Sequence, residues 1–156
     1  MSLEIERKFL VKSDAFKQQA VEQTRIVQAY LNSDKRRTVR VRIRGQQGFL
    51  TIKGQSSESG LSRYEWEKPI SLSEAEQLLA LCEPGAIDKV RYLVPVGQHM
   101  FEVDVFAGAN QGLIVAEVEL QSEQEAFTKP AWLGEEVTGQ NCYYNSMLSQ
   151  HPYTNW

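Results

Sequence analysis

The chain has 156 residues, of which 42% are hydrophobic and 24% are charged, and its formal net charge at pH 7 is −3. This length predicts one domain over residues 1–156, without room for a second full domain. The slightly negative net charge argues against non-specific electrostatic binding of DNA or RNA, so no nucleic-acid partner is expected. The chain lacks a run of about 18 apolar residues and a signal-peptide pattern, so we expect a cytoplasmic protein without a membrane partner.

Most of the chain alternates between apolar and polar residues with the period of two that is typical of β-strands. In chain order, strands are expected at residues 2–11, 24–32, 37–45, 48–54, 62–69, 87–95, 99–106 and 112–120. The linkers GQQG and VPVGQH predict two hairpins, one between the third and fourth strands and one between the sixth and seventh. The Gly/Ser-rich stretch at 54–62 predicts a mobile loop.

Three helices are expected, at residues 13–22, 71–82 and 141–150. The second has the strongest signal, because Ser71 is followed three residues later by Glu74, which is the spacing of a capping box. Successive strands with few helices predict a β-rich α+β fold with an antiparallel sheet. Eight is also the number of strands at which a sheet can close into a barrel around a small space.

Charged residues occupy alternate positions in seven of these strands, so the charges of each strand share one face. The set comprises Glu4, Glu6, Lys8, Arg40, Arg42, Arg44, Lys53, Arg63, Glu65, Glu67, Lys89, Arg91, Glu102, Asp104, Glu117 and Glu119. Two architectures explain this pattern. Either an open sheet shows its charges to water, or a closed sheet holds them inside and is covered by helices on its apolar outer wall.

The signs of these charges are segregated, with three arginines on one strand and pairs of acids on others. Like charges two residues apart repel each other, which favours a ligand between them over a purely structural role. Acid pairs suit a hard divalent cation, and rows of arginine and lysine suit phosphate oxygens. The pattern therefore predicts a site for a metal-chelated polyphosphate, with the solvated sheet as the open alternative.

Several longer motifs carry these residues in order along the chain. They are EIERK (4–8), VRVRIRG, TIKG with Lys53, SRYEWE, KVRY with Lys89 and Arg91, FEVDVF with Asp104, AEVEL with Glu117 and Glu119, and WLGEEVTG. In these motifs the chain resembles the CYTH superfamily, the triphosphate tunnel metalloenzymes, and in particular its short bacterial inorganic triphosphatases. The resemblance implies a closed eight-stranded antiparallel β-barrel, or tunnel, with a charged interior and helices packed outside.

The resemblance also implies roles for individual residues. The metal, Mg²⁺ or Mn²⁺, would be held by Glu4, Glu6, Asp104, Glu117 and Glu119. The phosphates would be held by Lys8, Arg40, Arg42, Arg44, Lys53, Lys89 and Arg91. Arg63, Glu65, Glu67 and Glu102 would support the lining. Tyr30, with Lys53 as its partner, would take the proton from the attacking water; the alternatives are an ordinary strand tyrosine and a metal-bound hydroxide.

The leading interpretation is metal-dependent hydrolysis of inorganic triphosphate, a small-molecule substrate. Two alternatives stay open: action on an organic triphosphate, as an adenylate cyclase, nucleoside triphosphatase or thiamine triphosphatase, and a non-catalytic polyphosphate or nucleotide sensor. The late segment GQNCYYN carries Asn141 and Cys142 where many relatives have a basic residue. We therefore expect no cation from the last helix at the tunnel mouth. The sequence is compatible with a homodimer but does not indicate the oligomeric state.

Overall fold

The computed structural model describes residues 2–156, which form nine strands joined into one antiparallel sheet. The strands are β1 (Ser2–Val11), β2 (Glu22–Asn32), β3 (Arg37–Arg44), β4 (Gln47–Gly54), β5 (Ser62–Ile70), β6 (Ile87–Val96), β7 (His99–Phe106), β8 (Ile114–Glu119) and β9 (Leu133–Glu136). Their order in the sheet is β5-β4-β3-β2-β6-β7-β8-β1-β9. The eight predicted strands are all present, with boundaries within two residues of the prediction.

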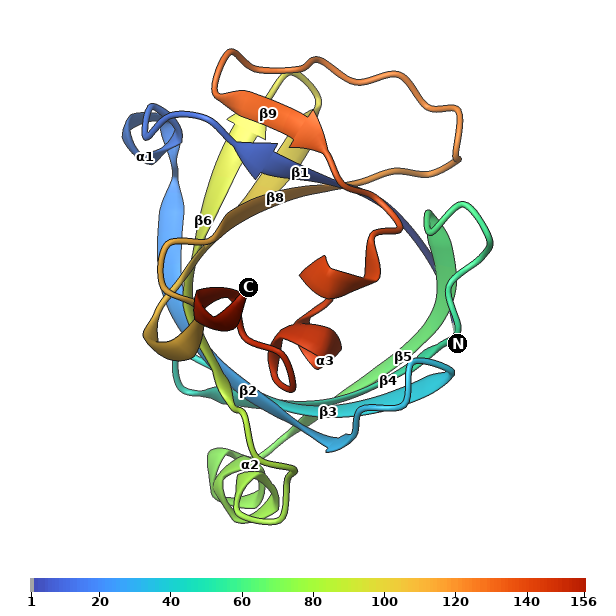
Figure 1. The fold of residues 1–156 in the computed structure, drawn as a ribbon, viewed down its shortest axis with the longest axis vertical. Coiled ribbons are helices and arrows are strands. Elements are labelled where there is room, and N and C mark those ends of the chain that lie inside the picture. The colour runs from blue at the N-terminus through green and yellow to red at the C-terminus, as the bar shows by residue number, and fades with distance from the viewer. Residues whose placement is uncertain (1) are drawn as a thin grey trace.

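The sheet closes because β1 has partners along both of its edges. On one side Glu6 to Leu10 pair with β8, and on the other side Ser2 to Ile5 pair with β5, so that Glu4 lies opposite Arg63. The result is a closed eight-stranded antiparallel barrel, seen end-on as a ring in Figure 1. This closure confirms the predicted barrel.

The ninth strand, β9, was not predicted. It pairs with the second half of β1, where Phe9 lies opposite Glu136 and Val11 opposite Leu133. Because this edge of β1 extends beyond β5, β9 supplies the backbone partners that β5 does not reach. The four residues of β9, LGEE, are too few and too irregular to show the alternation of a strand.

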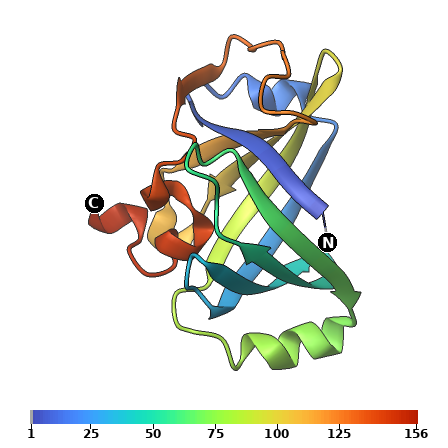
Figure 2. The same cartoon turned by 90° about the vertical axis from the view of Figure 1, so that its right-hand side faces the viewer.

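The helices are short: α1 (Phe16–Gln19), α2 (Leu72–Leu79) and α3 (Asn145–Leu148), with 3₁₀ turns at Gly108–Asn110, Asn141–Tyr143 and Tyr153–Asn155. Helix α2 packs outside the barrel, and its predicted capping box is confirmed (Figure 2). The Glu74 amide donates to Ser71 Oγ at 3.0 Å, and the Ser71 amide donates to Glu74 Oε1 at 2.9 Å. A Cβ on Gly48 of β4 would lie 2.7 Å from the Ala75 Cβ, so the glycine allows this close approach.

Loop segments, more than helices, cover the apolar outer wall of β1, β6, β7 and β8. Its core contains Phe9, Phe16, Phe101 and Trp132, each at most 1% exposed. Phe16 comes from α1, which is only four residues long because β2 begins sooner than expected. Trp132 comes from the segment before β9. Residues distant in sequence therefore cover the outer wall, which the sequence pattern predicted to be covered by helices.

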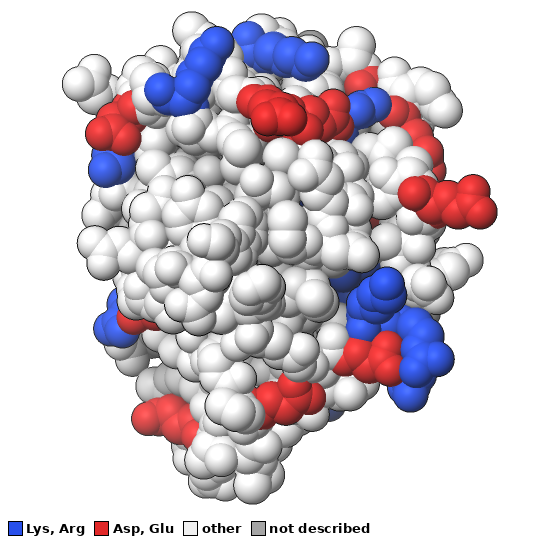
Figure 3. Space-filling view, in the orientation of Figure 1, with Lys and Arg blue, Asp and Glu red and all other residues white. Residues whose placement is uncertain are grey.

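The prediction of helices outside the barrel holds for α1 and α2, but α3 lies inside the ring in Figure 1 and at one end of the barrel in Figure 2. We call residues 141–156 the C-terminal plug. Its Leu148 is fully buried against inward-facing apolar residues of the barrel and the turn before β8, namely Ile87, Phe106, Leu113 and Val115. Figure 3 shows the centre of this end filled by uncharged atoms.

Two further features bear on the sequence predictions. Both Cys82 and Cys142 are free thiols; Cys82 is half-buried and Cys142 is exposed. Within residues 2–156, none of the helices has the length and apolar character required to cross a bilayer.

Candidate active site

A cavity of about 200 Å³ lies inside the barrel. Its wall is formed by the alternate strand positions at which the charged residues occur. Every predicted site residue lines it except Lys89 and Asp104. The lining residues are Glu4, Glu6, Lys8, Tyr30, Thr38, Arg40, Arg42, Arg44, Thr51, Lys53, Arg63, Glu65, Glu67, Arg91, Glu102, Glu117, Glu119, Tyr144, Asn145 and Ser146. The parity of the strands therefore turns the predicted charged faces toward one shared space.

Glu4 is the centre of an ion-pair cluster where β1 meets β4 and β5. Lys53 Nζ lies 2.9 Å and 3.1 Å from the two Glu4 carboxylate oxygens, and Arg63 Nε lies 3.6 Å from one of them. Lys53 Nζ also lies 3.4 Å from Glu65. Burial by itself would raise the pKa of Glu4, but the charges of Lys53 and Arg63 lower it to about 2. Glu4 is therefore a carboxylate at neutral pH.

Glu6 and Glu117 form a second, more repulsive cluster on β1 and β8. Burial and the facing carboxyl groups of Glu117 and Glu4 raise the pKa of Glu6 well above its usual range. The pKa of Glu117 is lowered in spite of its burial, chiefly by Lys8, whose Nζ lies 3.7 Å from Glu117 Oε1. Two neighbouring carboxyl groups thus resist being ionised together.

Asp104, Lys89 and Arg91 form a buried network at the side of the cavity. Asp104 accepts hydrogen bonds from Arg91 Nε at 2.8 Å and Nη2 at 2.9 Å, and lies 2.7 Å from Lys89 Nζ. Lys89 also donates to Asn145 Oδ1 at 3.0 Å. Burial lowers the pKa of Lys89 to about 7, against the opposing effect of Asp104. The side chains of Lys89 and Asp104 are 0% and 3% exposed, which explains why neither lines the cavity.

The arginines of β3 bring positive charge that the protein only partly balances. Arg40 lies 3.7 Å from Glu67 and donates to Thr51 Oγ1 at 3.2 Å. Arg42 donates to the neutral amide oxygen of Gln28 at 2.8 Å. Burial, together with the charges of Arg40 and Arg91, lowers the pKa of Arg42 to about 9. An anion in the cavity would relieve this repulsion.

Tyr30 is 6% exposed and lines the cavity from β2, opposite Arg40 of β3. Within residues 2–156 it has no hydrogen bond to Lys53, whose ammonium group is engaged by Glu4 and Glu65. The predicted proton-accepting pair is thus near the same cavity but not in contact, and its role stays a prediction.

Five lining residues were not predicted: Thr38, Thr51, Tyr144, Asn145 and Ser146. Thr38 and Thr51 share the parity of Arg40 and Lys53, so the alternation could have identified them. Residues 144–146 belong to the C-terminal plug and follow no strand pattern. The Tyr144 ring packs against two cations, with its centroid 4.9 Å from Lys8 Nζ and 5.5 Å from Arg63 Cζ.

Among residues 2–156, no three His, Cys, Asp or Glu side chains converge as a ready-made metal site. The carboxyl groups of Glu4, Glu6 and Glu117 nevertheless lie close enough to affect one another's ionisation. Carboxylate oxygens are the ligands that Mg²⁺ prefers, and a divalent cation would remove their mutual repulsion. The donor set therefore fits a hard divalent cation, provided that Lys8 and Lys53 release these carboxylates.

Comparison with known proteins gives consistent results. The model of the CYTH domain family matches residues 2–151. A protein of Acetivibrio thermocellus named inorganic triphosphatase is 45% identical over 100% of this chain and 99% of its own length. One of Nitrosomonas europaea with the same name is 40% identical over 94% of this chain and 96% of its own length.

Solved structures agree with this result. The crystal structure of the inorganic triphosphatase NE1496 has a TM-score of 0.68 and 35% identity, covering 96% of this chain and 95% of that one. The HpAC1 protein from Hippeastrum, at 15% identity and a TM-score of 0.64 over 76% of this chain and 80% of that one, shares the fold. Matched by the family model over nearly its whole length, this chain belongs to the CYTH domain family.

Proposed function

We propose that this chain hydrolyses inorganic triphosphate in the cavity of its barrel, with Mg²⁺ or Mn²⁺ as cofactor. The observation that carries the proposal is the cavity itself, about 200 Å³ in volume and lined mainly by arginine, lysine and glutamate. Pockets for drug-sized organic ligands are larger, at roughly 300–1,000 Å³. The two relatives named inorganic triphosphatase match this chain over nearly their full lengths, which supports the same substrate here.

The basic residues of the cavity would bind and align the substrate. Arg40, Arg42, Lys8 and Arg63 all line the same space, so a linear triphosphate would meet several cations there. Guanidinium groups bind phosphate oxygens through paired, charge-assisted hydrogen bonds. Because Arg42 has only a neutral amide partner, its charge is available to a phosphate group.

The acidic residues would hold the cofactor. We assign Glu4, Glu6, Glu117 and Glu119 to this role, since all four line the cavity, and Asp104 to a supporting role through Arg91. A bound divalent cation would neutralise charge on the phosphate oxygens during attack by water. Burial and the carboxyl groups of Glu117 and Glu4 raise the pKa of Glu6, and a nearby divalent cation would favour its ionised form.

The chemistry of the chain's own residues follows from this arrangement. The arginine row would stabilise charge as it shifts from the bridging oxygen to the leaving phosphate. Tyr30 is our candidate for accepting the proton of the attacking water, because its side chain is in the wall opposite the carboxylates of β1. Lys53 would leave Glu4 and turn toward the substrate as the cofactor takes its place.

The alternative functions have weaker support. A nucleoside or a thiamine group would need a flat apolar surface. Within residues 2–156 the cavity wall offers only the rings of Tyr30 and Tyr144, and the Tyr144 ring packs against Lys8 and Arg63. Trp132, one aromatic residue that could have formed such a surface, lies in the outer core. A pure anion sensor would need the basic row but not the repulsive cluster of Glu4, Glu6 and Glu117.

The test is release of phosphate from tripolyphosphate, ATP and thiamine triphosphate in parallel, with Mg²⁺ or Mn²⁺. Tripolyphosphate is expected to react far faster than the other two, and Glu4→Gln should abolish the reaction. Glu76→Gln, on the exposed face of α2, is the matched control and should leave the rate unchanged. Binding of tripolyphosphate without turnover would contradict the proposal and favour a sensor.

A further inference from the structure

One end of the cavity is lined by the C-terminal plug, which contacts the loop at residues 55–61 through Tyr144. A Cβ on Gly60 would lie 2.3 Å from the Cα of Gly139, and both glycines have positive φ angles, +78° and +80°. Nearby, the Tyr144 hydroxyl donates to Ser56 Oγ at 3.3 Å. The loop is thus in close backbone contact with Gly139, just before the plug, and Figure 3 shows atoms filling the centre of this end of the barrel.

Tyr144 forms the inner surface of this end. Its ring lines the cavity and lies against Lys8 and Arg63, two cations that also line the cavity. A terminal phosphate carries more negative charge than an internal one, so it is the group that these two cations attract most strongly. The phosphate that enters first would therefore stop at Lys8 and Arg63, with the Tyr144 ring behind them.

The opposite end of the cavity opens to the surface and is partly acidic. Two surface hollows share wall residues with the cavity there: one shares Glu102 and Glu119, and the other shares Arg44, Arg91 and Glu102. Carboxylates at an opening disfavour further phosphate groups that protrude through it. A longer polyphosphate would meet a tyrosine ring at one end and, at the other, the carboxylates of Glu102 and Glu119 beside Arg44 and Arg91.

We propose that Tyr144 is a specificity-determining residue that sets the length of the polyphosphate chain accepted by the cavity. This inference rests on the proposed function and adds the selection of chain length to it. The aromatic ring, more than the hydroxyl group, limits how far the substrate enters, because the ring packs on Lys8 and Arg63. Removing the ring would deepen the cavity and make room for one more phosphate group.

The test compares the affinities for linear tetrapolyphosphate and tripolyphosphate, measured by titration calorimetry without divalent cation so that no turnover occurs. The wild type is expected to prefer tripolyphosphate. Tyr144→Ala should raise the ratio of tetrapolyphosphate to tripolyphosphate affinity about tenfold, a change of about 1.4 kcal/mol. Tyr144→Phe keeps the ring and should change the ratio less than about twofold.

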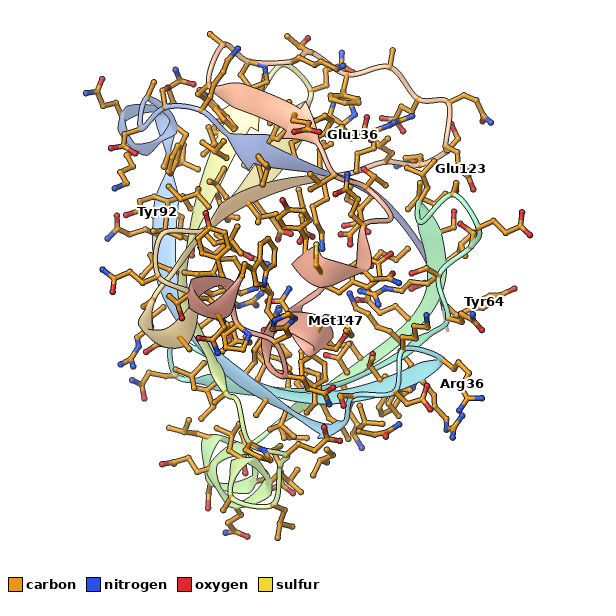
Figure 4. The ribbon with its side chains drawn as sticks, in the orientation of Figure 1. Arg36, Tyr64, Tyr92, Glu123, Glu136 and Met147 are labelled. Carbon is orange, nitrogen blue, oxygen red and sulfur yellow. The ribbon has the colours of Figure 1, made fainter. Side chains whose placement is uncertain are left out.

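The matched control is Tyr64→Ala, which removes a tyrosine that is 61% exposed and points away from the barrel in Figure 4. The ratio of tetrapolyphosphate to tripolyphosphate affinity in this variant should equal that of the wild type. Thermal unfolding reports whether each variant is folded; if Tyr144→Ala is not, Tyr144→Leu still removes the ring and should shift the ratio in the same direction.

Three results would overturn the inference: an unchanged ratio in a folded Tyr144→Ala or Tyr144→Leu protein, an equally large shift in Tyr144→Phe, or no binding of either polyphosphate by the wild type. The proposed function fails on a different result, namely wild-type protein that binds tripolyphosphate but releases no phosphate with Mg²⁺ or Mn²⁺. The two failures are therefore distinguishable.

Discussion

The interior of the barrel has two halves of opposite character. One half is the charged cavity, and the other is the apolar cluster in which Leu148 of the C-terminal plug packs against Ile87, Phe106, Leu113 and Val115. The same strands supply both halves: on β6 the inward face changes from Ile87 to Lys89 and Arg91. Apolar and charged side chains therefore project from the same face of a strand, and their position along the strand decides whether they lie in the apolar cluster or in the cavity.

This difference shows how a barrel can keep a charged interior and remain stable. Burying the apolar cluster is favourable at about 25 cal/mol per Å² of apolar surface. Burying charges costs free energy unless they are paired or hydrated. The apolar half therefore supplies stability, whereas the charged half is kept folded by ion pairs such as Lys53 with Glu4 and Lys89 with Asp104.

The largest expected effect tests whether the buried ion pairs stabilise the charged half. Asp104→Asn leaves Lys89 and Arg91 without their buried carboxylate and should lower the free energy of unfolding by about 3–5 kcal/mol. Urea denaturation without divalent cation measures this. Asp88→Asn, which removes the exposed partner of Arg25, is the control and should cost less than about 1 kcal/mol. A stable Asp104→Asn protein would instead favour a role in metal binding.

The next effect tests the apolar half. Leu148→Ala removes a side chain that is 0% exposed and should lower the free energy of unfolding by about 3 kcal/mol through lost burial and a cavity. Activity per folded molecule should stay within about threefold. Leu81→Ala, at a side chain that is 74% exposed, should change stability by less than about 0.5 kcal/mol. If both variants cost the same, the plug does not supply the stability assigned to it.

Glu6→Gln should separate function from stability. Loss of this carboxyl group should slow triphosphate hydrolysis about a hundredfold, which corresponds to about 2.7 kcal/mol in the barrier. The free energy of unfolding should be unchanged or higher, because the variant replaces a carboxyl group whose ionised form is opposed by burial, Glu117 and Glu4 with a neutral amide. Phosphate release and urea denaturation are measured on the same sample. A protein that loses stability and activity together would contradict the proposed division.

The smallest effect lies outside the barrel. Ser71→Ala removes the cap of α2 and should lower the free energy of unfolding by about 1 kcal/mol at neutral pH. Hydrogen bonds from Ser71 lower the pKa of Glu74 below its ordinary value of 4.5. The stabilisation from the ionised Glu74 is thus present above that value and is lost as the pH falls through the lower, folded-state pKa. The variant keeps the amide of residue 71, which contributes most to this shift, so the difference between variant and wild type should shrink only slightly below pH 4.5, as thermal unfolding at several pH values would reveal.

Sequence alternation was sufficient to predict the eight strands of the barrel and the side chains that share its interior. A strand turns successive side chains to opposite faces, so residues such as Arg40 and Arg42 of β3 or Glu117 and Glu119 of β8 share a face wherever the strand lies. The resemblance to a known family then assigned these faces to the inside of a closed sheet, and residues from them line the cavity.

Other features depended on contacts between residues distant in sequence. Strand β9 exists because β1 extends beyond β5, and Tyr144 reaches the cavity because Leu148 anchors the plug in the apolar half. Lys89 and Asp104 have the predicted parity but lie outside the cavity wall, since Asn145 of the plug hydrogen-bonds to Lys89. The alternation of residues within a strand determines to which face a side chain points. Only the tertiary structure determines what covers that side chain, because the covering segment is distant in the sequence.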